Sequence, residues 1–211
     1  MTYIIKFFVA VGVSAVILFM MSFFIISKVS STTDDVLLSQ YDSIIILSGD
    51  PERAVLASSL YNSKLANHIL LSKEDREINN FIYEEKIKTH LLYLKILKNS
   101  GVTRGDITLF GDNNTSTIEE ILALSNINLN RSETFLVITN KYSIYRTKIL
   151  IDRILPEYTM HLTYPRKQYR NSKWWMEKNS IIAVFSEFLK LILLHTFGDF
   201  NNYLSYSKEL D

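Results

Sequence analysis

The chain has 211 residues and no cysteine, which excludes disulfides, thiolate catalysis and cysteine-ligated zinc or iron–sulfur clusters. Its 23 Lys and Arg residues nearly balance its 22 Asp and Glu residues, so the formal net charge at pH 7 is only +1. This balance lacks the basic character of general nucleic-acid binding proteins, and we expect no nucleic-acid partner.

The first expected element is a helix that spans a lipid bilayer. The run from Phe7 to Ile26 has no charged side chain, and about 20 such residues form a helix of about 30 Å, the thickness of the hydrocarbon core. Lys6 and Lys28 flank the run and can reach the two interfaces. The alternatives are a buried core helix and a cleaved signal peptide. An anchor is favoured because the run exceeds a signal h-region and no A-x-A site follows.

The charges beside this run indicate its orientation only weakly. Lys6 and the amino group precede the span, whereas Lys28 follows it and is soon followed by Asp34 and Asp35. Because the positive-inside rule counts basic residues, the two sides nearly tie. The slight excess before the span predicts that the following domain lies outside the cytoplasm.

The remainder of the chain alternates between short apolar runs and amphipathic segments. We expect strands at Ser43–Leu47, His68–Leu71, Ile107–Phe110, Phe135–Thr139 and, more weakly, Tyr158–Leu162. We expect helices from Pro51 through Tyr61 and over Ile82–Asn99, Thr115–Leu129, Ile144–Leu155 and Trp174–Phe197. This order predicts an α/β fold, a Rossmann-like three-layer sandwich with a mostly parallel five-stranded sheet, preceded by one N-terminal transmembrane helix.

The expected domain organisation follows from these elements. The chain divides into a membrane anchor at 1–30, a linker or short polar helix at 31–40, one α/β domain at 41–200 and a polar tail at 201–211.

Polar side chains follow each of the first four expected strands. Ligands of open α/β sheets bind outside the carboxyl ends of the strands, so these side chains are candidate ligand-binding residues. They are Gly49, Asp50, Arg53, Ser72, Asp112, Thr117, Glu119, Thr139, Tyr142 and Arg146. The alternative is that the turns after the first and third strands only cap the next helices. Neither a G-x-G-x-x-G motif nor a P-loop is present, and His68, His161 and His195 lack metal-ligand spacing, so no metal is expected.

Two arginines give this edge an expected preference for anions. Arg53 and Arg146 lie in the first turns of helices, where a cation opposes the helix dipole. We therefore predict that they converge on a pocket with Glu119 at its rim, where an anionic ligand would be held. The alternative is that each pairs with an acid of its own helix, such as Glu52 or Asp152.

Taken in order, these segments resemble the YdcF/SanA/ElyC family of bacterial proteins. The resemblance rests on IIILSGDPERAVLASSLY, ILLSKED, STIEEILAL, LVITNKYSIYR and the tail KWWMEKNSIIAVFSEFLKLI, and it covers roughly residues 41–197. Three positions differ from the family pattern: Lys73 replaces a glycine, Glu120 an asparagine and Ser143 a histidine.

The resemblance implies a Rossmann-like fold and a single-pass protein of the bacterial inner membrane, with its domain on the periplasmic side. It implies a role in the cell envelope, in peptidoglycan or surface-glycan biogenesis, with an anionic or phosphorylated small molecule or a lipid-linked glycan as ligand and the lipid bilayer as partner. One branch of the family implies S-adenosylmethionine as a cofactor. An enzyme that binds S-adenosylmethionine or a nucleotide, and a non-catalytic assembly factor, therefore stand as alternatives, the latter favoured by Ser143 and Glu120.

Overall fold

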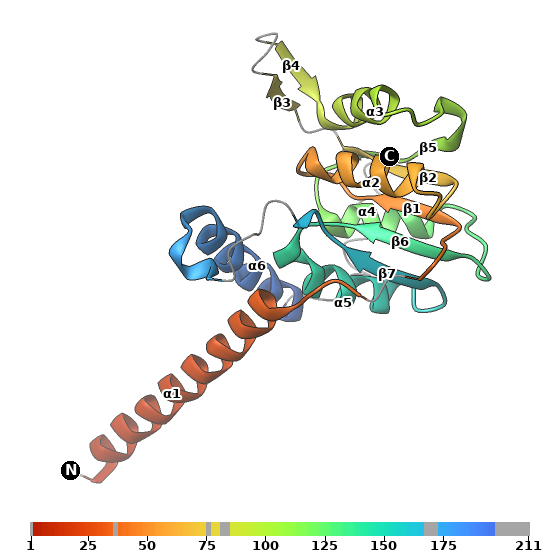
Figure 1. The fold of residues 1–211 in the computed structure, drawn as a ribbon. Helices are drawn as coiled ribbons and strands as arrows, with labels where there is room; N and C mark the ends of the chain where they lie inside the picture. Colours follow the sequence, from red (N-terminus) through yellow and green to blue (C-terminus); the bar gives the residue numbers. More distant parts are fainter. Residues whose placement is uncertain (1, 36–37, 75–76, 81–84, 167–172, 197–211) are drawn as a thin grey trace. The chain divides into compact units, whose positions relative to one another are not determined.

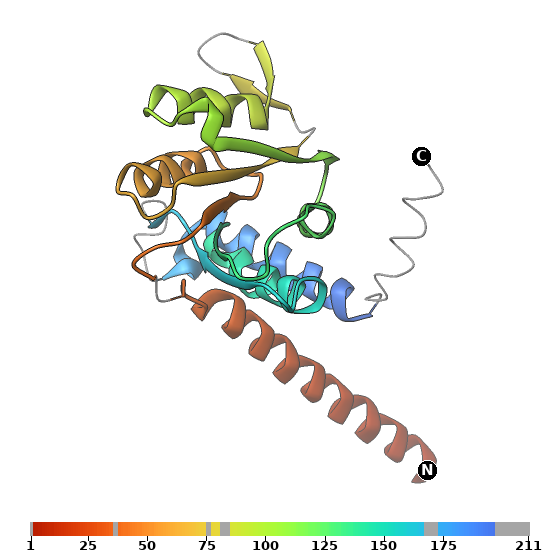
Figure 2. The same ribbon diagram turned by 90° about the vertical axis from the view of Figure 1, so that its right-hand side faces the viewer.

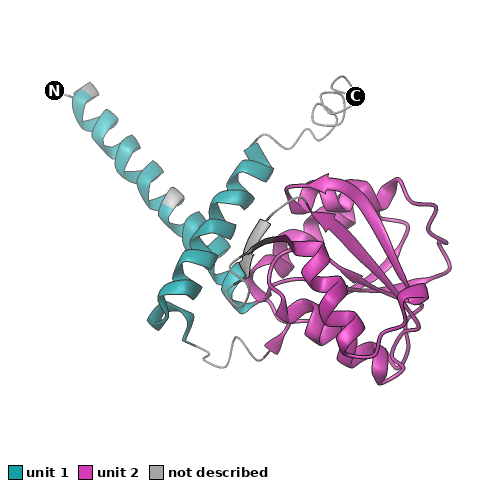
Figure 3. Cartoon of the chain, turned by 90° about the horizontal axis from the view of Figure 1, so that it is seen from above, with its two compact units in different colours: residues 1–31, 173–211 teal, residues 32–172 magenta. Residues whose placement is uncertain are grey.

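The computed structural model describes residues 2–35, 38–74, 77–80, 85–166 and 173–196. The chain forms two compact units, which Figure 3 colours separately. The α/β unit comprises residues 32–172, and the helical unit comprises residues 1–31 and 173–211. The last long helix thus groups with the first one, whereas we expected it inside a domain at 41–200.

The α/β unit is built on a five-stranded sheet in which every pair of neighbouring strands is parallel. The strands are β1 (Ser43–Ile46), β2 (His68–Glu74), β5 (Ile107–Asn114), β6 (Thr134–Ile138) and β7 (Thr159–Thr163). Their order across the sheet is β5-β2-β1-β6-β7 (Figure 1), so the order reverses between β1 and β6. The predicted parallel five-stranded sheet is confirmed.

Helices cover both faces of this sheet, which explains the continuous apolar runs in its central strands. Ile44 and Ile46 of β1 belong to one core cluster with residues of α2 (Glu52–Asn62) and α3 (Thr89–Asn99). The side chain between them, Ile45, is also fully buried and points to the opposite face because strand residues alternate. The helices α4 (Thr117–Ser125) and α5 (Ile144–Ile154) pack together there (Figure 2).

The expected helix over Ile82–Asn99 is wrong in its first part. The helix α3 begins only at Thr89, because Glu85–Lys88 forms strand β4. This strand pairs antiparallel with β3 (Glu77–Asn80) in a separate two-stranded sheet. The sequence EKIK has a single apolar residue, Ile87, so its pattern alone does not distinguish a strand from the first turn of a helix. The strands β2 and β5 also run past their expected ends at Leu71 and Phe110.

The segment before β1 is irregular where the structure describes it, as expected for a linker. It is nevertheless tied to β7: the Asp35 backbone N–H donates to the carbonyl of Leu162 (3.0 Å), and the Leu162 N–H donates to the Asp35 carboxylate (2.9 Å). Asp34 accepts a hydrogen bond from Arg166 at 2.7 Å.

The helical unit contains two long apolar helices. The helix α1 (Thr2–Ser31) and the helix α6 (Lys178–Thr196) are both long and apolar enough to cross a membrane, with mean hydropathies of 2.7 and 1.3. The most hydrophobic stretch of α1 is not buried at all. The short 3₁₀ turn Trp174–Met176 precedes α6, so the regular helix begins four residues after its expected start.

We expect Leu136→Ala in β6 to lower the free energy of unfolding by about 2–5 kcal/mol, the cost of a cavity in a packed core. Leu136 is fully buried between two parallel neighbours. Urea unfolding of the full chain in micelles measures this change. The matched control is Leu38→Ala, whose side chain is 41% exposed and whose removal should change stability by less than about 0.5 kcal/mol. Equal losses in both variants would contradict the placement of Leu136 in the core.

Candidate functional site

Polar residues gather at the carboxyl edge of the sheet. Ile46 of β1 pairs with Leu71 and Ile138, so Ser72 and Thr139 each lie one residue beyond that register, level with the end of β1. Ser48 lies two residues beyond the end of β1, and Asp112 lies in the last part of β5. Because these strands are parallel, Ser48, Ser72, Asp112 and Thr139 share one edge of the sheet, as expected for residues at the ends of successive strands.

The turn after β1 leads into α2 and holds its shape through its own polar groups. The Asp50 carboxylate accepts a hydrogen bond from the Glu52 N–H (2.9 Å), and the Tyr93 hydroxyl donates to the Asp50 carbonyl (2.6 Å). Gly49 has a φ of +144°, a conformation that side chains rarely adopt. A Cβ at Gly49 would lie 2.7 Å from the guanidinium of Arg53, so only glycine leaves room for this arginine.

Arg53 joins the ends of the two strands between which the strand order reverses. Its side chain is buried, and Nη1 donates to the carbonyls of Leu47 (2.8 Å) and Ser48. Its Nε donates to the side-chain oxygen of Asn140, which follows β6, at 3.3 Å. The hydrogen bonds of Arg53 therefore reach across the sheet edge and do not go to Glu52.

A buried carboxyl group, that of Glu120 in α4, lies beside this arginine. It is 1% exposed, and its Oε1 accepts a hydrogen bond from the Ser48 N–H at 2.6 Å. The hydroxyls of Ser72 and Ser48 also bond to it, and the Asn114 amide donates to the Ser72 hydroxyl at 3.2 Å. Residues that follow or end β1, β2 and β5 thus form one polar network around Glu120.

The environment of Glu120 favours its protonated form. Burial raises the pKa of this carboxyl, because a charged group loses its hydration in the interior. Hydrogen bonds from Ser72 and Ser48 and the positive charge of Arg53 act in the opposite direction, but burial is the larger effect and the pKa lies above its ordinary value. A protonated carboxyl donates one hydrogen bond as well as accepting others.

Arg146 enters the same region from α5. It is buried, and its Nη2 donates to the hydroxyl of Thr117 at 3.4 Å. Thr117 and Glu120 are three residues apart on α4, which places their side chains on the same side of that helix. Arg146 therefore contacts the side of α4 that also carries Glu120.

Glu119 occupies a different position from its neighbour. Its carboxylate accepts hydrogen bonds from the N–H (2.6 Å) and hydroxyl (2.9 Å) of Thr115, while its own N–H donates to the Ser116 hydroxyl that caps α4 (3.3 Å). Ser116 is thus the N-cap of α4. The carboxyl that lies within the network is that of Glu120, which we had treated only as a departure from a family pattern.

The other expected site residues lie around this network. Asp112 pairs with Lys73 at 2.6 Å on the surface, where this bond and charge lower the pKa of Asp112. Thr139 is buried, and its N–H donates to the carbonyl of Thr163 in β7 (3.0 Å). Tyr142 is buried, and the Lys141 ammonium lies 5.6 Å from the centre of its ring.

The structure adds residues that the sequence reasoning did not select. They are Ser48, Asn114, Glu120 and Asn140. The spacing of Thr117 and Glu120 along a helix was the available signal, since it places Glu120 rather than Glu119 on the side of Thr117. Within the described part of the chain, no three His, Asp or Glu side chains are arranged to hold a metal ion.

Comparisons of this chain with models of known protein families, with curated proteins and with solved structures found no match. The class that the fold and this edge define is an α/β protein with a parallel sheet and a buried polar network at the carboxyl ends of its strands.

We expect Glu120→Gln to remove one pH dependence of stability. Because the pKa of Glu120 is raised in the folded state, its protonated form contributes stability that is fully present below the ordinary carboxyl pKa and is lost as pH rises through the raised pKa. The variant should therefore gain stability relative to the parent as pH rises from about 4. Urea unfolding at a series of pH values measures the difference.

Asp112→Asn is the control, because the contribution of Asp112 to stability should change with pH in the opposite direction to that of Glu120. The pKa of Asp112 is lowered, so its contribution is present above the ordinary pKa and is lost as pH falls. Its effect should be small because the pair with Lys73 is exposed. A difference between Glu120→Gln and parent that does not change with pH would contradict the assignment of a raised pKa to Glu120.

Proposed function

We propose that this chain is a membrane-anchored cell-envelope protein that binds an anionic ligand at the carboxyl edge of its sheet. The observation that carries the proposal is the buried network at the point where the strand order reverses, in which the charge of Arg53 acts on the buried carboxyl of Glu120 and a second buried arginine, Arg146, donates to Thr117 of the same helix. Open α/β sheets bind their ligands at such points. The order of the five parallel strands supports a Rossmann-like fold.

The chemistry of the edge favours phosphate groups or carboxylates as ligands. Guanidinium groups bind both in a planar, two-point geometry, as Arg53 and Arg146 would. A protonated Glu120 would donate to an anionic oxygen instead of repelling it. The Ser48 N–H, which now bonds Glu120, is a further donor at the same place. We accordingly expect both arginines to face one ligand, with Thr117 between them.

The anchor and the family resemblance give the proposed setting. An unburied apolar helix of 30 residues supports α1 as a membrane span. The resemblance to the YdcF/SanA/ElyC family supports peptidoglycan or surface-glycan biogenesis, with the α/β unit on the outer side of the cytoplasmic membrane. A phosphorylated small molecule or a lipid-linked glycan would supply the anionic group.

The strand order also favours a second candidate. In doubly wound proteins with the same reversal, nucleotides bind across the first and fourth strands, which correspond to β1 and β6. An enzyme that takes S-adenosylmethionine or a nucleotide would bind it at this edge. The adenosyl group of such a ligand distinguishes this candidate from the main proposal.

Thermal unfolding of the full chain in micelles tests these candidates. A ligand at 100 times its Kd adds about 2.7 kcal/mol of stability. We expect a higher melting temperature with pyrophosphate or a polyprenyl phosphate, whereas a rise only with S-adenosylmethionine would favour the second candidate. If none of these compounds raises the melting temperature, the ligand-binding proposal fails and a non-catalytic assembly role is favoured.

We expect Arg146→Ala to lose most of the ligand-induced rise while changing the melting temperature of the ligand-free chain little. The reason is that its guanidinium would contact the ligand directly, beside the Thr117 hydroxyl to which it donates at 3.4 Å. The matched control is Arg153→Ala, an exposed arginine of the same helix. A large loss of stability in the ligand-free Arg146→Ala chain would make this arginine structural.

A reporter enzyme that is active only outside the cytoplasm, fused after Asp211, tests the proposed location. We expect activity, because the charges around the span favour a cytoplasmic amino terminus. Activity of a cytoplasm-specific reporter at the same position would contradict the orientation.

A further inference from the structure

The helix α6 carries apolar side chains on two opposite sides. One side is buried and includes Val184, Leu191 and Leu194. The opposite side is exposed and consists of Ile182, Phe185, Leu189, Ile192 and Leu193. These five residues recur every three or four positions, which places them in one stripe along the helix. A surface helix of a soluble domain has polar residues on the side opposite its core, so this second stripe needs another explanation.

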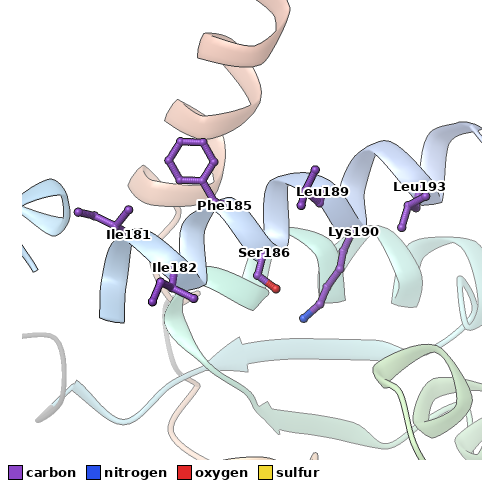
Figure 4. A pocket seen from close by; sticks show the side chains of 7 residues that line it. All are labelled: Ile181, Ile182, Phe185, Ser186, Leu189, Lys190 and Leu193. Carbon is purple, nitrogen blue, oxygen red and sulfur yellow. The ribbon is translucent and has the colours of Figure 1, made fainter. Parts of the chain in front are cut away.

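The acidic group at the middle of α6 lies on the side away from the exposed stripe. Glu187 is 4% exposed and accepts a hydrogen bond from Lys190 at 2.9 Å. Lys190 and Ser186 border the stripe on one flank, where a shallow groove runs along the helix, as Figure 4 shows. The stripe itself therefore presents only apolar surface, from Ile182 to Leu193.

A lipid bilayer is the occupant that the rest of the helical unit favours. The helix α6 packs against α1, whose side chains from Phe7 to Phe24 are largely exposed and apolar. The surface of α6 is thus continuous with a helix suited to acyl chains. Trp174 and Trp175 stand just before α6, and Trp175 is 58% exposed. Exposed tryptophans beside an apolar helix are typical of the membrane–water interface.

The arrangement of the two helices distinguishes a helix lying at the interface from a second span. Within the helical unit, α6 runs across the carboxyl end of α1 and not alongside it (Figures 1 and 3). The pair Glu187–Lys190 lies near the middle of α6, where a spanning helix would place it at the costly centre of the bilayer. An interfacial helix keeps such a pair away from the acyl chains while its apolar side enters them, in agreement with Glu187 lying on the buried side of α6.

We propose that α6 lies in the membrane interface with the stripe Ile182–Leu193 against the acyl chains. This proposal goes beyond the ligand site and rests on the proposed membrane insertion of α1. It gives the chain a second membrane contact: the segments that leave the α/β unit at both ends then lead to membrane-bound helices.

Single-cysteine labelling of the full chain tests this contact, because the natural sequence has no cysteine. Leu189→Cys carries an environment-sensitive nitrobenzoxadiazole label in vesicles of phosphatidylethanolamine and phosphatidylglycerol. We expect loss of quenching by aqueous iodide and strongest quenching by lipids that bear a nitroxide close to the headgroup. Val16→Cys, in the middle of α1, is the reference for deep insertion, and Val55→Cys, an exposed apolar position of α2, should remain open to iodide.

Each other result for the Leu189 label would overturn the proposal. Strongest quenching by nitroxides near the bilayer centre would show that α6 spans the membrane. Quenching by iodide would place the stripe in water, and protection from both quenchers would show that protein covers it, either a second copy or the segment 197–211. Lipid quenching of the Leu189 label without lipid quenching of the Val16 label would contradict the membrane insertion of α1. It would still support the membrane contact of α6.

Discussion

The hydrogen bond from the Ser48 backbone to the buried carboxyl of Glu120 is the contact on which the candidate site depends. It joins the first turn after β1 to α4, two elements far apart in the sequence. A carboxyl group buried without donors would be strongly destabilising, so its neighbours must supply hydrogen bonds and charge. Ser72 and Arg53 do so from β2 and α2. The glycine at position 49 follows from the same requirement, because the Arg53 guanidinium occupies the space of its missing side chain.

This network gives the sheet edge two properties that a ligand site needs. The side chains are held in place by one another, as the bonds from Arg53 to Asn140 and from Asn114 to Ser72 show. Two buried cations also lie there, since Arg53 acts on Glu120, whose pKa burial raises, and Arg146 donates to Thr117 of the same helix. A rigid edge that carries cations is suited to recognising an anion. The fold, rather than loop movement, then fixes the position of the bound anion.

Much of the fold could be predicted because its central strands are buried on both faces. A run such as SIII or TFLVI is apolar without interruption, and the glycine, proline and polar turns between such runs mark the helices. The β3–β4 hairpin was missed because EKIK is too short to distinguish a strand from the start of a helix. The long apolar segment of α6 was recognised as a helix, but its two opposite apolar sides became distinct only when the buried one was known.

The sequence by itself determined which residues reach the carboxyl edge, since every strand of a parallel sheet ends there and Ser48, Ser72 and Thr139 each follow or end an apolar run. Only the tertiary structure decided which neighbouring carboxyl points into the network. Glu119 and Glu120 differ by one residue, about 100° of rotation on a helix, and they bond to Thr115 and Ser48 respectively. The packing of α4 against β5 and α5 sets that rotation, and such packing depends on contacts between segments distant in the chain.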